Sequence, residues 1–513
     1  MTPLLSLLFR FVRQTLRRTR PERPILPLSL ALSVCAACTT VGPEYTAPDL
    51  APRVSSHFRA EALYSGELTP QASLDNWWEQ FEDPTLNYLV DAALSRNQTI
   101  EVALYGVQAA WQTEYATHRN RFPTLGASAN TSRSRTAAAA IVTDVPTLGE
   151  GLEAFEGSNE FNLATTASWE VDLVGRLART REAATAEAGQ AYANFLDVQR
   201  VVVGETVSAY AAYLGTELRL AITDKNIALV EQFSSTVDKL LASKAATVLD
   251  KSQAMASFQE VRSARYEILS ERETALNRLA VLTGIPPAQF DRRFTEISPS
   301  LPFPKSLPIT DPISVLRQRP DIRLAEREVA LETARIGIAQ ADYYPRLQWA
   351  STFGLSSAQV QNLLTGPAFT YSLGPSLDFA LLDYPQIGAR VDAQTATMQA
   401  ALARFDQAVL QALEETENAL AAYWYETHTL QSLSAAVAAR QAAKQQTDLR
   451  VSAGIGSLLD RLEADRDLIE AQRLLAESEV RAFTRLIEVY RAFGGSVSDD
   501  KNLGYQAMIL ADY

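Results

Sequence analysis

The sequence predicts a mainly helical protein with a small β part, built as two related halves. Three observations support this fold class. One block of the first half recurs in the second half, long stretches keep a three–four spacing of apolar residues, and four short runs have the period of β-strands. With 513 residues, the chain can form several domains or one large elongated one.

The internal repeat is clearest in residues 93–125, which match residues 315–347 without a gap at a shift of 222 positions. A second match, at a shift of 210, relates "SAYAAYL" from Ser208 to "NALAAYW" from Asn418. The alternative is chance similarity between two Ala-rich helices. We therefore expect five segments: a signal peptide (1–37), an extended N-terminal segment (38–83), a first repeat (84–300), a second repeat (301–495) and a C-terminal tail (496–513).

Each half is expected to contain the same elements in the same order. A helical segment ends at a Phe-Pro or Tyr-Pro and precedes two strands, after which a long helix and a return helix follow. At 1.5 Å per residue, each long helix would extend about 100 Å. The expected helices are 84–120, 177–242 and 247–283 in the first half, and 312–341, 387–452 and 458–493 in the second.

The second strand of each half alternates most clearly. In "FNLATTASWEVDL", Phe161, Leu163 and Trp169 share one face, with Asn162 and Ser168 on the other. The run "FTYSLGPSLDFAL", from residue 369, behaves likewise, and "LQWASTFGL", from residue 347, is a weaker example. This period of two is typical of a half-buried strand or of a membrane β-barrel strand.

The return helix of the second half predicts how it packs. One stripe of three–four spacing is unbroken, which is the pattern of a coiled-coil seam, and a second stripe is less complete. A helix with two such stripes has a neighbour on each side, so we expect a wall of helices, although a buried bundle helix would look similar. The unbroken stripe contains Leu459, Leu462, Arg466, Ile469, Arg473, Ala476, Val480, Phe483, Ile487 and Tyr490.

If the strands cross a membrane, the chain must form an oligomer. Four strands are too few to close a barrel, and open sheet edges are not tolerated in lipid. Three copies would supply twelve strands, and this is the simplest closure. A dimer with eight strands stays open by this argument alone.

The two cysteines of the chain, Cys35 and Cys38, follow a basic segment and a short apolar run. This order is typical of a secretory signal. The residues "AAC" that end at Cys38 fit a lipoprotein cleavage site, which requires a small residue immediately before the cysteine. Cys35 follows Val34, which fits that position poorly. We therefore expect Cys38 to be the acylated first residue of the mature chain, anchored in outer-membrane lipid. A redox pair is the alternative, and no other cysteine or nearby histidine supports it.

The charge of the chain argues against a nucleic-acid partner. Its formal net charge is −13, and removal of residues 1–37, with six Arg and one Glu, makes it −18. Phosphate backbones require a basic surface. After the signal, no segment offers about 18 uninterrupted apolar residues for a transmembrane helix.

Five blocks in the expected order resemble the TolC-like outer-membrane efflux channels. They resemble most the lipoprotein branch that works with resistance–nodulation–division pumps, and the similarity covers essentially the whole mature chain. The blocks are "CTTVGPEYTAP", "WWEQFEDPTLNYLVDAAL", "ASWEVDLVGRLAR", "VLRQRPDIRLAEREVALETARIGIAQADYYPRL" and "VYRAFGG".

The resemblance implies a homotrimer with a twelve-stranded barrel in the outer membrane and a long α-helical barrel in the periplasm. It also implies a passive exit duct for drugs, metals or other toxic solutes, docked to a periplasmic adaptor and an inner-membrane resistance–nodulation–division pump. A channel for type I secretion with an ABC exporter is the alternative within the same architecture.

The resemblance further places the periplasmic tip at the turns of the long hairpins. Gly454 and Gly456 permit the second turn. Side chains just beyond it would constrict the pore, with Glu463 where Asp is commoner in the family and Asp465 where Gln is usual. In the first half, Asp250 is the candidate tip carboxylate. The expected gate residues are Leu459, Leu462, Glu463, Arg466 and Asp250.

The sequence gives no indication of catalysis or of a cofactor. Its three histidines are scattered and fit no zinc site, and no Gly-rich phosphate loop or Gly-x-Ser-x-Gly motif occurs. Glu414 and Glu415 are adjacent on a helix and point about 100° apart, so they fit a solvated or interhelical face better than a paired-carboxylate site. We expect neither an enzyme nor a resident metal. An acylated coiled-coil scaffold without a pore is an alternative, but it would not explain the strands. A surface-anchored hydrolase is a further alternative, and it lacks a catalytic constellation.

Overall fold

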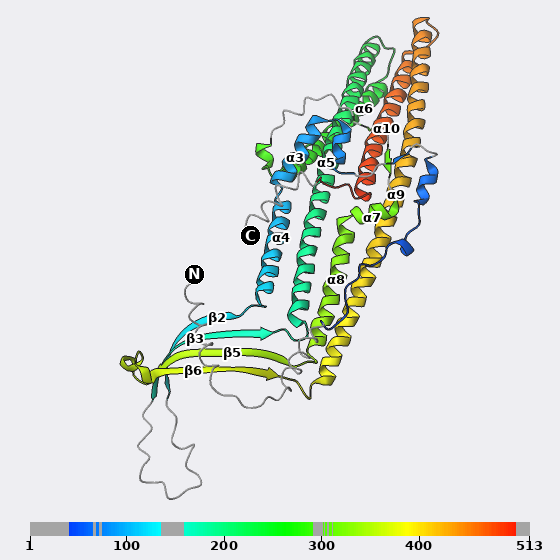
Figure 1. Ribbon diagram of the computed structural model, residues 1–513. Coiled ribbons are helices and arrows are strands. Elements are labelled where there is room, and N and C mark those ends of the chain that lie inside the picture. The colour runs from blue at the N-terminus through cyan, green and yellow to red at the C-terminus, as the bar shows by residue number, and fades with distance from the viewer. Residues whose placement is uncertain are drawn as a thin grey trace. The chain divides into compact units, whose positions relative to one another are not determined.

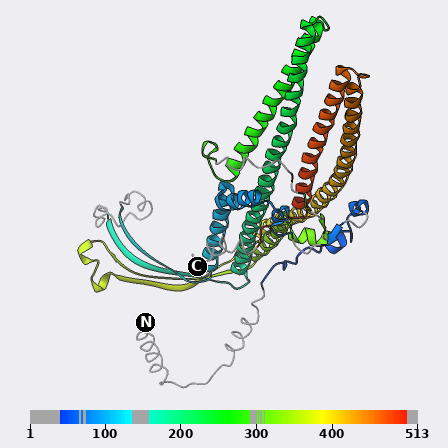
Figure 2. The ribbon, with the colours of Figure 1, turned by 90° about the horizontal axis from the view of Figure 1, so that it is seen from above.

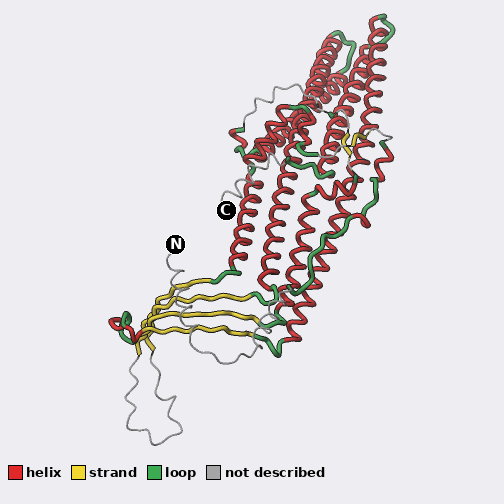
Figure 3. The backbone as a smooth tube through the Cα atoms, viewed as in Figure 1, coloured by secondary structure: helices red, strands yellow, loops and turns green. Residues whose placement is uncertain are grey.

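The computed structural model describes residues 40–64, 68–70, 74–134, 158–290, 301, 303–304, 307–309 and 311–498. At 68–70, 158, 307–309 and 458–459 only the backbone is described. The predicted signal peptide, Cys38 and most of the predicted tail lie outside these ranges. Within them, helices dominate, and the strands form one four-stranded sheet and one short pair (Figures 1 and 3).

The first half contains four helices and two strands of the main sheet, and the second half matches it. The first-half elements are α3 (Pro84–Arg96), α4 (Gln98–Arg119), β2 (Thr124–Ser134), β3 (Ser158–Val171), α5 (Arg176–Ala242) and α6 (Val248–Leu282). The second-half elements are α7 (Pro312–Gln318), α8 (Pro320–Ala341), β5 (Arg346–Ser357), β6 (Phe369–Asp378), α9 (Tyr384–Ser452) and α10 (Leu458–Ala492). Strands β1 (Leu68–Pro70) and β4 (Leu307–Ile309) pair in parallel.

The predicted long and return helices are confirmed, with bounds that differ by at most three residues. The prediction of one continuous helix over 84–120 and another over 312–341 is wrong. The first is interrupted at Asn97 and the second at Arg319, and both residues have an extended backbone. Arg319 precedes Pro320, whose ring disfavours a helical residue before it. The Asn97 side chain instead caps α4 by accepting the N–H groups of Thr99 and Ile100.

The chain divides into two compact units. One comprises residues 1–43, 119–180 and 337–391, and its described part contains the main sheet with the adjoining helix ends. The other comprises residues 44–118, 181–336 and 392–513, and it contains most of each helix. No helix in the described ranges has an apolar stretch long enough to cross a membrane.

The helical unit is held by a continuous apolar core. Trp77 stacks on Tyr490 with ring centroids 5.0 Å apart, and Phe81 packs against Phe483. These contacts bring the segment before α3 onto the C-terminal part of α10. A smaller cluster, which includes Ile322 and Phe405, joins α8 to α9. The apolar core therefore lies where the segment at the start of the first repeat meets α10 at the end of the second repeat.

Candidate functional site

The main sheet has one apolar and one polar face. Its order is β2-β3-β5-β6, and every neighbouring pair is antiparallel. Directly paired residues share a face, so the pairing of Trp169 with Trp349 extends the apolar face predicted for β3 across the sheet. The exposed side chains of this face include Leu125, Leu163, Trp169, Trp349, Phe353, Tyr371, Leu373 and Leu377.

The opposite face carries mainly hydroxyl, amide and small side chains. Asn162 pairs with Asn130 and Ser356, and Thr166 pairs with Gly126 and Thr352. Large apolar groups that are exposed on one side of a sheet, with a hydrophilic surface on the other, fit a wall between lipid and water. The outer strands β2 and β6 each have only one partner in the described sheet.

The two long hairpins end in turns with the same backbone geometry. In the α9–α10 turn, Gly454 has φ +74°, and the N–H of Ile455 donates to the carbonyl of Arg450 at 2.9 Å. In the α5–α6 turn, Lys244 occupies the equivalent position with φ +62°, and Ala245 donates to Leu240 at 2.8 Å. The absence of glycine in the first turn therefore does not change the fold of the turn.

Gly456 is favoured by the tight space around it rather than by its backbone angle. A Cβ atom at this position would lie 3.0 Å from Cγ2 of Val451 and 3.1 Å from its backbone nitrogen. The chain consequently passes close to the end of α9 before α10 begins. Gly454, by contrast, has open space around it, so only its positive φ favours glycine.

Each return helix starts with a capping box. Thr247 and Asp250 cap α6, and Ser457 and Asp460 cap α10. The backbone and side chain of Thr247 both donate to the Asp250 carboxylate at 2.7 Å. These two hydrogen bonds lower the pKa of Asp250, and the bond from the Thr247 side chain has the larger effect. The expected gate residue Asp250 thus has a local role in starting α6.

The other expected gate residues lie along the first two turns of α10. Leu462 is half-buried, whereas Glu463 and Arg466 are exposed. For Leu459 only the backbone is described. Within the described part of the chain, Arg466 forms no ion pair within 4.0 Å.

A charge cluster that the sequence analysis missed joins α9 to α10 beside these residues. Lys444 Nζ lies 2.8 Å from Asp448 Oδ2 and 3.0 Å from Asp465 Oδ1, and Arg461 Nε lies 3.1 Å from Asp448 Oδ1. The hydrogen bonds to Asp448 and Asp465 raise the pKa of Lys444. The four-residue spacing of Lys444 and Asp448 on one helix was the available sequence signal.

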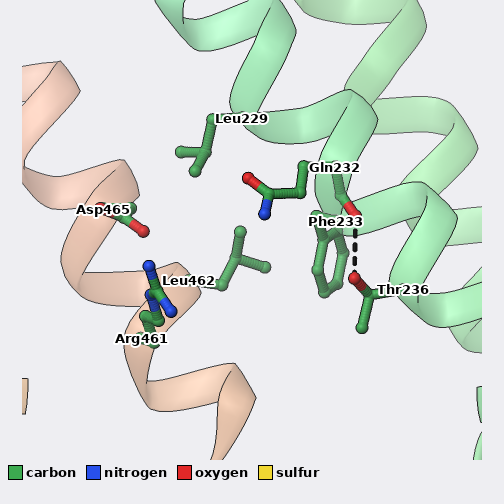
Figure 4. A pocket seen from close by; sticks show the side chains of 7 residues that line it. All are labelled: Leu229, Gln232, Phe233, Thr236, Arg461, Leu462 and Asp465. Carbon is green, nitrogen blue, oxygen red and sulfur yellow. Dashed lines mark hydrogen bonds between the residues drawn. The ribbon is translucent and has the colours of Figure 1, made fainter. Parts of the chain in front are cut away.

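A small groove lies between α5 and α10 at the same level (Figure 4). Phe233 of α5 and Leu462 of α10 face each other across it. Gln232 and Thr236 of α5 provide neutral polar groups, whereas Arg461 and Asp465 are the charged lining groups on α10. Ion pairs therefore join α9 to α10 within the second hairpin. The residues that α5 contributes to the groove are apolar or uncharged.

A second feature missed from the sequence is a buried arginine at the break between α7 and α8. Arg319 is 2% exposed and donates to the carbonyl of Ala492, at the end of α10, at 3.0 Å. Its guanidinium also binds Asp321 and Glu415 at 2.7 Å each. In the first half, Asn97 donates to the carbonyl of Leu282 at 2.9 Å. Each helix break thus binds the end of the return helix in its own half.

The described residues contain no group of three or more His, Cys, Asp or Glu side chains that could hold a metal ion. The geometry consists of an amphipathic sheet, long helices and a charged tip. Such an arrangement can line a path for solutes.

A model of the outer membrane efflux protein family matches residues 89–285 and 312–495. The chain is 26% identical over 496 residues to outer membrane protein OprJ of Pseudomonas aeruginosa, with 94% of this chain and 98% of OprJ covered. It is 27% identical over 484 residues to nodulation protein T of Rhizobium leguminosarum, with 94% and 98% covered.

Solved structures agree. The outer-membrane channel OprN matches with a TM-score of 0.77 and 32% identity, over 89% of this chain and 99% of OprN. The Campylobacter jejuni CmeC outer membrane channel matches with a TM-score of 0.79 and 21% identity, over 92% of this chain and 98% of CmeC. The second likeness concerns the fold alone.

Proposed function

Because this chain belongs to the outer membrane efflux protein family, we propose that it is the outer-membrane channel of a tripartite resistance–nodulation–division efflux system. It is a passive exit duct for drugs, metals or other toxic solutes. Relatives support this role by their names: ArpC of Pseudomonas putida is an antibiotic efflux pump outer membrane protein, and SrpC is a solvent efflux pump outer membrane protein.

The observation that carries the proposal is the two-faced sheet, whose outer strands β2 and β6 each have one partner in the described sheet. Exposed Trp169, Phe353 and Leu373 on one face fit lipid, and the small polar side chains on the other face fit a water-filled lumen. An open sheet edge is not tolerated in lipid. Three copies, each with four strands, would close a twelve-stranded barrel, which makes the homotrimer the simplest assembly.

The long helices would extend the duct into the periplasm. Helices α5 and α9 contain 67 and 69 residues, which correspond to about 100 Å each. The exposed apolar side chains at the two tips, Val248 and Leu249 on α6 and Ile455 in the second turn, would bind the periplasmic adaptor. The pump would supply the free energy for transport, so the channel itself needs no catalytic group.

The lipid anchor would be Cys38. Cys38 lies outside the described residues, and this proposal is supported by the basic segment, the apolar run and the residues "AAC" that end at it.

Crosslinking in living cells, followed by purification and mass spectrometry, tests the proposed function. Recovery of a periplasmic adaptor and a resistance–nodulation–division pump is the expected result. Recovery of an ABC exporter would favour type I secretion instead. Recovery of neither, together with unchanged drug sensitivity in a deletion strain, would contradict the proposal.

The tip residues Leu459, Leu462, Glu463 and Arg466, together with Asp250, would constrict the closed channel. Replacement of Glu463 or Arg466 by Ala should raise the leak conductance of the isolated protein in planar bilayers, because the charged groups that narrow the opening are removed. Glu488→Gln is the matched control, since Glu488 lies on the same helix about 37 Å from Glu463. Equal conductance in all variants would rule out this gate.

A further inference from the structure

A groove of about 430 Å³ lies between α5, α9 and the C-terminal part of α10, which runs beside α9 (Figures 1 and 2). This volume is within the range of small-molecule sites. The charged lining residues are Arg200 of α5, Glu415 of α9, and Arg485, Glu488 and Arg491 of α10. Three guanidinium groups and two carboxylates give the lining a formal charge of +1, whereas the whole chain has −13. The groove is therefore a basic spot in an acidic protein.

The groove lies on the face of α10 that points away from the apolar core. Phe483, Ile487 and Tyr490 are fully buried in that core. Because an α-helix has 3.6 residues per turn, Arg485 and Glu488 project from the opposite side of α10. A duct needs an uncovered inner face, and the core side of α10 is covered by the segment before α3. In the proposed channel the groove consequently lines the path of the solute.

Two of the three guanidinium groups already have partners. Arg200 Nη2 lies 2.6 Å from Asp197 Oδ1, and Arg485 Nη1 lies 2.8 Å from Glu488 Oε2. Arg491 differs, since its side chain forms no hydrogen bond or ion pair with any residue that the structure describes. A guanidinium group has five N–H donors in a planar fork that matches carboxylates and similar anions. Arg491 is therefore the group that can bind a ligand without breaking an ion pair.

A glycine of α5 makes room for the Arg491 side chain. A Cβ atom built on Gly204 would lie 2.7 Å from both Cδ and Nε of Arg491. The side chain of Arg491 thus lies directly across the α5 backbone. Its guanidinium is held near that of Arg200, whose Nη1 donates to the Arg491 carbonyl at 3.3 Å.

The equivalent groove of the first half, between α5 and α6, has the opposite charge. A shift of 210 residues relates the three charged α10 residues to Ala275, Arg278 and Val281. The charged residues that line this groove are Glu267, Glu271 and Arg278, so its formal charge is −1. The surplus of arginine is therefore a property of the second half and not of the repeat itself.

We propose that the groove between α5, α9 and α10 binds the acidic group of a solute in transit, a carboxylate or a sulfonate, with Arg491 as the main donor. The inference rests on the proposed function and deepens it, since it names acidic compounds as one class of exported solute. An acidic duct repels anions, and a local group of arginines lowers that barrier. Binding should be weak, because a conducted solute must also leave.

Titration calorimetry of the purified full-length protein tests the site, with naphthalene-1-sulfonate as the probe and about 0.15 M salt. We expect saturable binding of this anion and none of 1-naphthylmethylammonium, which has the same rings and a positive charge. Arg491→Gln should weaken binding of the sulfonate about tenfold, because charge-assisted hydrogen bonds are lost. Arg491→Lys, which keeps the charge but not the planar fork, should restore part of the affinity.

Arg481→Gln is the matched control. Arg481 lies on the same face of α10, pairs with Glu426 and is about 15 Å from Arg491 along the helix. At this salt concentration its charge is screened over that distance, so the affinity should change less than about twofold. Glu488→Gln should act in the opposite direction and strengthen binding, because it removes a carboxylate and frees Arg485. If Arg491→Gln does not accumulate, Arg485→Gln replaces it and should also weaken binding.

Four results would overturn the site. These are no saturable binding of the sulfonate by the unaltered protein, equal affinity for the cationic probe, unchanged affinity in Arg491→Gln, and an equal loss in Arg481→Gln. None depends on which pump is recovered, so failure of the proposed efflux role and failure of this site are separate outcomes.

Discussion

The α5–α6 hairpin and the α9–α10 hairpin share one backbone plan but are held together by different side chains. The ion pair Asp238–Lys251 in the first hairpin corresponds to Asp448–Arg461 in the second. Near its tip, the second hairpin adds Lys444–Asp465 and Arg440–Asp467. At the equivalent positions the first hairpin has Ser234 and Met255, and Val230 and Ser257.

The same contrast recurs at the other end of each hairpin. The neutral Asn97 holds the end of α6, whereas the charged Arg319 holds the end of α10. The two halves thus keep side-chain contacts at equivalent positions, but the residues that make these contacts differ in charge. The second hairpin, which carries the expected gate residues Leu462, Glu463 and Arg466, has more ion pairs between its helices near the tip. The first hairpin has pairs such as Arg265–Asp224 and Arg272–Glu217 farther from its tip.

The two halves are expected to differ most in how much the residue at each helix break, Asn97 or Arg319, contributes to the free energy of unfolding. Arg319→Ala should lower the free energy of unfolding by about 3–5 kcal/mol, because it leaves the Asp321 carboxylate and the Ala492 carbonyl without their partner. Glu415 adds little, since its side chain is 59% exposed. Asn97→Ala should cost about 1–3 kcal/mol, because the Leu282 carbonyl loses its donor and the N–H groups of Thr99 and Ile100 lose the side chain that caps them. Denaturant unfolding of the purified protein measures both changes.

Arg323→Ala is the control for the first comparison, since this exposed arginine belongs to the same sequence block. It should change stability by less than about 0.5 kcal/mol.

Burial would raise the pKa of Asp321, but the hydrogen bond and the charge of Arg319 outweigh it and lower the pKa. The stabilisation is therefore present above the unfolded pKa of about 3.9 and is lost as the pH falls through the lower folded value. Equal costs for Arg319→Ala and Asn97→Ala at pH 7 would refute the contrast.

The turns should differ less, and in opposite directions. Gly454→Ala should destabilise the α9–α10 turn by about 1–2 kcal/mol, because a Cβ atom is unfavourable at positive φ. Lys244→Gly should stabilise the α5–α6 turn by about 0.5 kcal/mol, because the backbone strain exceeds the entropy that glycine adds to the unfolded chain. Hydrogen exchange at the amides of Ile455 and Ala245 reports each turn separately. Slower exchange in Gly454→Ala would contradict the expectation.

These contrasts also explain how far the sequence could predict the molecule. The long helices and the alternating strands follow from residue periodicity, and the matching regions could be aligned without a structure. The helix breaks were missed because the apolar spacing continues through Asn97 and Arg319, while the interruption comes from a side-chain cap and a proline. The buried contacts of Arg319 were missed because Glu415 and Ala492 lie 96 and 173 positions away along the chain.

At the tip, the sequence could place the turn but not the charge cluster. Gly454 and Gly456 indicated the reversal, and both have a structural reason for being glycine. The approach of Lys444 to Asp465 depends on how two helices are rotated about their axes, and a periodic pattern defines this rotation only to within about one residue. The gate itself stays a prediction, since the constriction would require several copies.

The smallest expected difference concerns the additional ion pairs of the second hairpin. The double variant Arg440→Ala and Lys444→Ala should lower the local stability of the α9–α10 tip by less than about 1 kcal/mol per pair, because Arg440–Asp467 is exposed and Lys444–Asp465, although half-buried, stays in contact with water. Ser234→Lys with Met255→Asp places the equivalent of Lys444–Asp465 in the first hairpin and should gain a similar small amount. Hydrogen exchange at low and high salt measures both effects, which should diminish above about 0.5 M salt. A loss that is independent of salt would mean that the packing of the long side-chain stems, rather than charge, holds the second hairpin together.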